Sequence, residues 1–321
     1  SAIPAGAEVF IQTATPEPIG ESAAEVTISN VSVTGSNATL PILTTGQPAH
    51  ELKMSDGFDN AYPFTPERLV EQVYRLGYRD WYVLYLGISK YHSLVWDAGE
   101  ARYVVDPATP LNAPAAQWLE DFLARLDAKG FTLILSMSFE ILGQWMPTDW
   151  AQRDKDGNAA ATGWVPPSSL FAPTNSDALA YVRDVYLAVL DLLPGGAAIH
   201  VQVGEPWWWD GSYSNGAPCI YDATTEAAYV SATGNAVPTP KLATIYGEPD
   251  PIHRPYLEWC RDQLGAATAW LIAEIRAVHP TATSHLLIFT PQILRTDAPL
   301  LRTLNFPQAD WTAPAFDVLQ I

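Results

Sequence analysis

Long apolar runs are absent from this 321-residue sequence, which contains no stretch of about 18 or more apolar residues that would suit a membrane-spanning helix. The first ten residues, SAIPAGAEVF, also lack the basic start and extended apolar segment of a secretory signal. We therefore expect no membrane insertion. Because a processed chain that begins at Ser would have lost any such signal, an extracellular location stays open.

Basic residues are scarce. The chain has 17 Lys and Arg against 35 Asp and Glu, which gives a formal net charge of -18. A surface with this excess of negative charge repels phosphate backbones and anionic lipid, so we expect no nucleic-acid partner. The hydrophobic fraction of 48% is that of a folded protein, and the length suits one large domain or a barrel with a small appendage.

Cysteine is rare as well, with only Cys219 and Cys260 in the chain. One lies in a predicted loop and the other in a predicted helix, without metal-type spacing, so we expect free thiols while a pairing of the two stays open. No cluster of His, Cys and Asp has the spacing of a metal site, and we predict neither a metal nor a cofactor. The acidic stretch from Asp154 to Asn158 lacks the downstream Glu of a calcium loop and is predicted to be a solvated turn.

Residues 1–48 differ in composition from the remainder of the chain. They are rich in Thr, Ser, Ala and Pro and contain short alternating runs such as EVTIS and VSVT. This pattern indicates β-strands or an extended arm. We therefore divide the chain into a β-rich arm or partial β domain at 1–48 and a second domain at 49–321.

From residue 51 onward, apolar strands alternate with amphipathic helices. The predicted strands cover 51–55, 81–86, 131–139, 198–203, 284–289 and 316–321. A helix is predicted to begin after Thr65, which suits an N-cap before Pro66, and further helices are predicted at 113–128, 177–193, 256–278 and 298–304. Near-continuous apolar strands separated by helices predict an α/β fold with a covered parallel sheet.

Two architectures fit this alternation, a doubly wound open sheet and a (β/α)8 TIM barrel. No G-x-G-x-x-G follows the first strand, and aromatic and acidic residues gather after the strand ends, as at the active face of a barrel. We therefore predict a TIM barrel. Only six strand–helix steps are found, so we expect either a barrel truncated after the sixth strand, as a piece of a longer polypeptide, or an incomplete count.

The stretch VQVGEPWWWDG, from Val201 to Gly211, follows this pattern at the end of the fourth predicted strand. Glu205 comes directly after the strand, and Trp207, Trp208 and Trp209 follow it. Three consecutive indoles cannot all face one core, because neighbouring side chains point in different directions in both strands and helices. At least one of them is therefore predicted to be exposed or to line a cleft.

The sequence Gly204-Glu205-Pro206 resembles the Asn-Glu-Pro motif at the end of strand four in retaining (β/α)8 glycoside hydrolases. The resemblance implies that Glu205 is the general acid/base, with Gly204 standing where that family has Asn. In the family the second carboxylate follows strand seven, which this chain does not reach. Such enzymes need two carboxyl groups, so Glu140 after strand three is our candidate partner, with Asp56 and Asp59 after strand one as rivals.

Aromatic side chains extend the candidate site. The three consecutive tryptophans, with Trp145 and Tyr213, could provide flat apolar surfaces for sugar rings and raise the pKa of a neighbouring acid by desolvation. Each has a plainer interpretation as a packing residue. Glu205 could equally be bound to backbone or to an arginine, and His200 is either a structural residue inside the barrel or a ligand-binding one.

A wider resemblance covers roughly residues 50–321. The Thr/Ser-rich N-terminal segment, the run Val-Gly-Glu-Pro-Trp-Trp-Trp and the terminal stretch from Pro314 to Ile321 resemble the TIM-barrel region of phage non-contractile tail sheath proteins. This implies a virion tail component that contacts other tail subunits in a homo-oligomeric assembly. Two functions follow from it: a barrel that binds or cleaves host surface polysaccharide with Glu205 as acid/base, or a catalytically inactive barrel that serves as a packing module.

Overall fold

A computed structural model describes residues 46–87, 90–211, 213 and 215–321. Residues 1–45 of the predicted N-terminal β segment lie outside this part of the chain. Everything below concerns the unit from Gly46 to Ile321.

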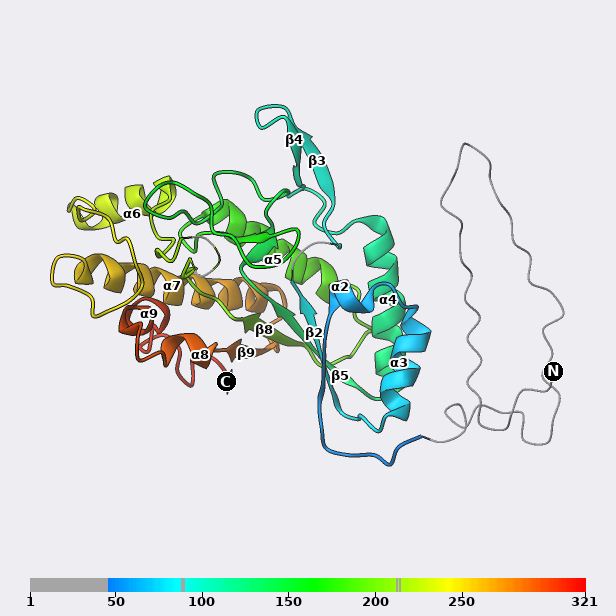
Figure 1. The fold of residues 1–321 in the computed structure, drawn as a ribbon. Coiled ribbons are helices and arrows are strands. Elements are labelled where there is room, and N and C mark those ends of the chain that lie inside the picture. The colour runs from blue at the N-terminus through cyan, green and yellow to red at the C-terminus, as the bar shows by residue number, and fades with distance from the viewer. Residues whose placement is uncertain (1–45, 88–89, 212, 214) are drawn as a thin grey trace, which may run out of the picture. The chain divides into compact units, whose positions relative to one another are not determined.

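Six parallel strands form the central sheet (Figure 1). They are β1 (Met54–Gly57), β2 (Trp81–Leu86), β5 (Thr132–Met137), β8 (His200–Gly204), β9 (Thr283–Leu287) and β10 (Val318–Gln320). Their order across the sheet is the order of the chain, and every neighbouring pair is parallel. A doubly wound sheet reverses its strand order at a switch point, whereas a barrel adds each strand on the same side. The topology is therefore that of the first six strands of a TIM barrel.

Helices connect the strands, and they include all those that the sequence predicted. The longer ones are α3 (Pro66–Arg75), α4 (Ala113–Ala128), α5 (Ser176–Leu190), α6 (Ala223–Thr233), α7 (Arg254–Val278) and α9 (Pro299–Asn305), and the single-turn ones are α2 (Phe58–Ala61) and α8 (Thr290–Ile293). Thr65 caps α3 by accepting a hydrogen bond from the backbone N–H of Arg68 at 3.4 Å, and Asn112 caps α4 through the N–H of Ala115. These caps satisfy N–H groups that a helix start leaves unpaired.

The two faces of the sheet differ in chemistry. In β2 the side chains of Tyr82, Leu84 and Leu86 are fully buried on the helix side, where the Tyr82 ring contacts Phe122 of α4 at 5.2 Å. The opposite face carries a row of register partners made up of Tyr85, Ser136, Gln202 and His285. Three of the four are polar residues exposed by 4% or less. The apolar face therefore forms the core with the helices, and the inner face is polar.

Two small antiparallel sheets were not predicted. β3 (Leu94–Asp97) and β4 (Arg102–Val105) form a hairpin that projects from the body in Figure 1. β6 (Glu140–Leu142) pairs with β7 (Ser168–Leu170). They are inserted after the carboxyl ends of β2 and β5, the edge at which barrels place their functional residues. Glu140, expected in a loop, is instead the first residue of β6.

Some further expectations can be compared with the described residues. β1 begins at Met54, later than predicted. Asp154 is buried at 1% exposure, which corrects the prediction of a solvated turn for that residue: it accepts hydrogen bonds from the backbone N–H groups of Asp156 and Asn158 at 2.8 and 2.9 Å. Cys219 and Cys260 are free, as expected, and both are buried.

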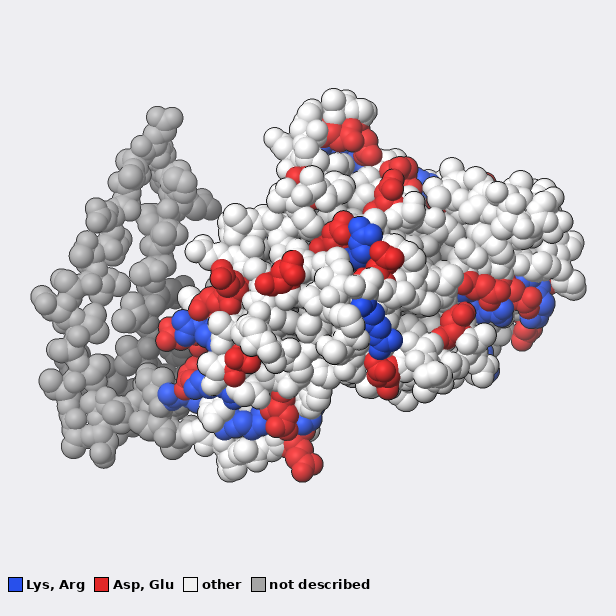
Figure 2. Space-filling view, turned by 180° about the vertical axis from the view of Figure 1, so that it is seen from behind, with Lys and Arg blue, Asp and Glu red and all other residues white. Residues whose placement is uncertain are grey.

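The surface carries charges of both signs. Figure 2 shows acidic and basic side chains in mixed groups, separated by wide uncharged areas, on the face turned to the viewer. Within the described ranges, no helix combines the length and hydropathy needed to cross a membrane. Nor does any group of three or more His, Cys, Asp or Glu in those ranges have an arrangement suited to a metal ion.

Candidate functional site: a carboxyl pair beside exposed aromatic rings

Glu205 directly follows β8, at the carboxyl end of the sheet. Its backbone N–H donates to the carbonyl of Leu287 in β9 at 3.2 Å, which fixes its backbone at the strand end. Its φ angle of 49° lies in the left-handed region, which costs a residue with a side chain about 1–2 kcal/mol. Strain of this kind is often found at functional positions, where the surrounding structure holds it in place.

Gly204 makes room for Tyr85 beside this glutamate. A Cβ atom at position 204 would lie 2.6 Å from the Ser136 hydroxyl and 2.9 Å from the Tyr85 ring, both shorter than real contacts of this kind. A larger side chain is therefore excluded while Tyr85 occupies its present position. This gives a physical reason for glycine where the resembling glycosidase motif has Asn.

Glu140 and Glu205 lie within electrostatic reach of each other. Burial is the main cause that raises the pKa of Glu205 above its ordinary value, and the charge of Glu140 raises it further. Burial also raises the pKa of Glu140, and the neighbouring polar groups of Ser168, Trp164 and Ser138 lower it by a smaller amount. The Ser168 hydroxyl donates to Oε1 of Glu140 from the neighbouring strand β7. Strands three and four of the barrel thus bring together the two residues chosen from the sequence as a catalytic pair.

Tyr85 completes this group. Burial, then the charge of Glu140 and, more weakly, that of Glu205 raise the pKa of its phenol well above the usual value, so it stays protonated. The buried Ser138 hydroxyl lies close enough to both Tyr85 and Glu140 to lower the pKa of each. The hydrogen bonds to Glu140 favour its ionised form, whereas no ion pair of Glu205 occurs among the described residues. The arrangement favours a protonated Glu205 beside an ionised Glu140.

The three consecutive tryptophans have different environments. Trp208 is fully buried, and its indole N–H donates to the carbonyl of Cys260 in α7 at 2.9 Å. It is therefore a packing residue that no ligand at the surface can touch. The substrate-binding role predicted for it does not fit this position. Trp207 is partly exposed and meets the edge of Phe289, while Trp209 is 6% exposed and its ring stacks with Tyr213 at 6.0 Å.

Exposed rings continue this aromatic series toward Glu140. Tyr213 is 67% exposed and its ring packs against Gly163, where an added Cβ would lie 2.6 Å away. The next residue, Trp164, is 60% exposed and hydrogen-bonds to Glu140. Aromatic surface thus extends from Phe289 at the end of β9 to Trp164 beside the carboxyl pair.

The remaining candidates have other partners. His200 lies at the start of β8, at the opposite end of the strand from Glu205, where its ring meets Trp81 at 4.8 Å and its Nδ1 lies 3.1 Å from His285 Nε2. Asp56 lies within β1 rather than after it and accepts from the Tyr82 hydroxyl at 3.4 Å. Asp59 in α2 accepts from the backbone N–H of Lys90 at 2.9 Å, and Trp145 after β6 contacts the His92 ring.

Sequence reasoning missed Tyr85 and Ser168. Tyr85 could have been found from the alternation of β2, which puts it on the inner face two residues before the loop. Ser168 could not, because its contact with Glu140 depends on a strand pairing across 28 residues of sequence.

The fold and these residues define a parallel α/β barrel protein with a carboxyl pair at its carboxyl edge. Residues 48–321 match the family model described as "Non-contractile tail sheath protein TIM barrel". The chain belongs to this family, as the sequence resemblance implied. Membership implies a component of a phage tail.

Solved structures of glycoside hydrolases are similar in fold only. A β-galactosidase from Bacillus circulans sp. alkalophilus has 13% identity and a TM-score of 0.44 over 74% of this chain and 37% of its own. A β-galactosidase from Rahnella sp. R3 has 15% identity and a TM-score of 0.43 over 73% of this chain and 35% of its own. An α-galactosidase from Geobacillus stearothermophilus has 14% identity and a TM-score of 0.38 over 76% and 29%. This chain spans about a third of their length.

Proposed function

We propose that this tail sheath barrel binds host surface polysaccharide and cleaves it with the carboxyl pair Glu205 and Glu140. The proposal rests chiefly on this pair, in which one carboxyl group raises the pKa of the other at the carboxyl edge of the sheet. Two neighbouring titratable groups whose surroundings give them different pKa values are typical of acid/base sites.

Aromatic side chains support a carbohydrate ligand. Trp164, Tyr213 and Phe289 are exposed by 60%, 67% and 37%, and Trp207 connects Phe289 to Trp209. Flat ring faces pack against the apolar faces of sugar rings, and large exposed rings beside a charged pair are more consistent with ligand contact than with core packing. The net charge of -18 is compatible with a neutral or weakly charged glycan.

Cleavage would follow the two-carboxylate route. Glu205, held protonated by burial and by the charge of Glu140, donates its proton to the glycosidic oxygen as the bond to the anomeric carbon breaks. Glu140, whose hydrogen bonds favour the carboxylate form against its burial, adds to that carbon and forms a glycosyl ester. Glu205, now a carboxylate, then takes a proton from water, and the resulting hydroxide displaces Glu140 from the sugar. The anomeric configuration is retained.

The test measures release of reducing ends from purified host polysaccharide. We expect Glu205→Gln and Glu140→Gln each to lower kcat by roughly 100-fold or more, which is what general acid–base groups typically contribute. Glu67→Gln, a charge removed from a side chain that is 76% exposed on α3, is the matched control and should keep full activity. Proton NMR of the first product distinguishes retention from inversion.

A binding assay with the same polysaccharide separates recognition from cleavage. Tyr213→Ala and Trp164→Ala should weaken binding by about tenfold each, since aromatic contacts are worth roughly 0.5–1.5 kcal/mol beyond the area they bury. Reducing-end release that is equal in the wild type and both Gln variants refutes catalysis. If the wild type neither binds nor cleaves, the barrel acts only as a packing module of the tail.

A further inference from the structure

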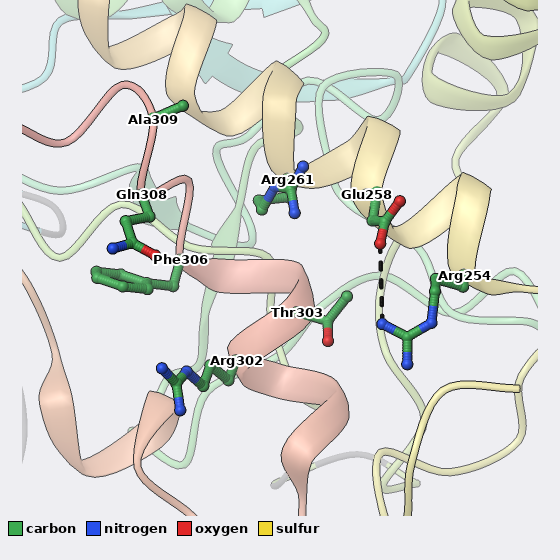
Figure 3. Close-up of a pocket in the computed structure, with 8 residues that line it drawn as sticks. All are labelled: Arg254, Glu258, Arg261, Arg302, Thr303, Phe306, Gln308 and Ala309. Carbon is green, nitrogen blue, oxygen red and sulfur yellow. Dashed lines mark ion pairs between the residues drawn. The ribbon is translucent and has the colours of Figure 1, made fainter.

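A second site lies on the helical side of the barrel. α7 and α9 border a pocket of about 540 Å³, shown in Figure 3, to which Arg254 and Arg261 contribute from α7 and Arg302 from α9. Small-molecule sites usually have volumes of about 300–1,000 Å³. None of the residues that line this pocket belongs to the carboxyl pair or to the aromatic series beside it.

Three arginines in one pocket are unusual for a chain with only 17 basic residues. Arg261 pairs with Asp262 at 2.7 Å, but Arg254 and Glu258 are 3.8 Å apart, too far for a hydrogen bond. The side chain of Arg302 has no ion pair, hydrogen bond or ring contact within the described residues, which include all 17 Lys and Arg.

Every other basic residue has a partner of one of these kinds. With 35 acidic residues on the same chain, an unpaired guanidinium is the exception. Its position in the pocket, on the opposite side of Thr303 from the loosely paired Arg254 (Figure 3), leaves positive charge available to a ligand.

The other lining groups suit a sugar. Phe306 presents an apolar ring next to Arg302, and Thr303 and Gln308 add a hydroxyl and an amide that can both donate and accept hydrogen bonds (Figure 3). We propose that this pocket binds an anionic sugar, with Arg302 on its carboxylate or phosphate oxygens and Phe306 against its ring. Planar guanidinium groups match the geometry of both oxyanions. This site does not depend on the proposed function of the carboxyl pair.

Isothermal titration calorimetry tests the proposal with four probes: glucuronate, glucose 6-phosphate, inorganic phosphate and glucose. We expect at least one of the two anionic sugars to bind at millimolar concentration or below, more tightly than glucose. Glucuronate alone would identify a carboxylate ligand. Binding of glucose 6-phosphate, together with weaker binding of inorganic phosphate, would identify a sugar phosphate as the ligand.

Variants link binding to the pocket. Arg302→Gln should weaken binding of the anionic sugar by about tenfold or more, because charge-assisted hydrogen bonds are roughly twice as strong as neutral ones. Arg68→Gln removes an arginine on α3 and should bind like the wild type. Glu205→Gln should also bind normally, so failure of the glycosidase proposal would leave this result untouched. Circular dichroism confirms that each variant is folded.

Three outcomes would overturn the proposal. The first is that neither anionic sugar binds at concentrations up to about 10 mM. The second is that glucose binds as tightly as the anionic sugars. The third is that the folded Arg302→Gln variant keeps the affinity of the wild type.

Discussion

Glu205 is held in an unfavourable state by both its backbone and its carboxyl group. The left-handed φ angle of 49° strains the main chain, and burial together with the charge of Glu140 disfavours ionisation. A carboxyl group whose pKa is raised on folding contributes most to stability below its unfolded value of about 4.5, and this contribution is lost as the pH rises through the folded pKa. At neutral pH, Glu205 therefore destabilises the fold.

Glu205→Gln should accordingly be more stable than the wild type at pH 7. The advantage should shrink as the pH falls and disappear below about 4.5, where both the folded and the unfolded wild type carry a protonated Glu205. Urea unfolding between pH 4 and pH 8 measures this, with Glu67→Gln as the control for the loss of one exposed charge. A Gln variant that is less stable than the wild type at neutral pH would contradict the account.

Gly204 illustrates how a single missing atom positions the site. In Gly204→Ala the new Cβ would meet the Ser136 hydroxyl and the Tyr85 ring, and both residues belong to strands of the sheet. We expect a loss of about 1–3 kcal/mol in unfolding free energy, the usual cost of overpacking. Gly195→Ala adds the same methyl group where nothing lies within 4 Å and should change stability little. Equal effects of the two substitutions in urea unfolding would rule out the close approach as the cause.

At the level of elements, the loop after β8 is held by the helices around it. Asn305 at the end of α9 accepts from the backbone N–H of Trp208 at 2.8 Å and donates to its carbonyl at 3.0 Å, while α7 accepts from the Trp208 indole. All these groups are buried. The buried tryptophan thus anchors the segment whose neighbours, Trp207 and Trp209, carry the aromatic surface.

Asn305→Ala should therefore destabilise the protein by roughly 2 kcal/mol or more, because two buried backbone groups lose their partners. Asn305→Asp keeps an acceptor for the Trp208 N–H but turns a buried carboxyl oxygen toward the Trp208 carbonyl and Gln292 Oε1, so it should be at least as destabilising as Ala. Thermal unfolding and acrylamide quenching of tryptophan fluorescence measure the two effects. Unchanged quenching in a destabilised Ala variant would show that the loop keeps its place without Asn305.

Local signals decided which elements could be predicted. The helix from Ala113 to Ala128 and the strand from Trp81 to Leu86 match their predictions, since each combines strong periodicity with clear ends such as the Asn112 cap. The pairing of β6 with β7 was missed because three-residue strands separated by a long loop leave no periodic signal. That pairing supplies the Ser168 contact to Glu140.

The two acidic residues of the candidate site could be predicted from the sequence, but the side chains that surround them could not. The strand-end positions of Glu140 and Glu205 follow from chain order, because parallel strands end at one edge of a sheet. Which of three successive indoles is buried depends on the packing of α7 and α9 against the loop, and that information is spread over residues such as Cys260 and Asn305.

For the molecule as a whole, the excess of negative charge opposes compactness. The ion pairs are at the surface, as in Lys53–Asp80 with side chains 44% and 62% exposed, and such pairs contribute about 0–1 kcal/mol each. Self-repulsion grows instead with the square of the net charge, here -18. Raising the salt concentration weakens both, and the repulsion should dominate.

We therefore expect the melting temperature at pH 7 to rise as NaCl increases from about 10 mM to about 150 mM, over which the screening length falls from about 30 to about 8 Å. The repulsion between separate protein molecules, measured by light scattering, should weaken over the same range of salt concentration. Sorbitol at equal osmolality is the control, because it changes solvation without screening charge. If salt instead lowered the melting temperature, the attractive ion pairs of this surface would outweigh the repulsion that its net charge produces.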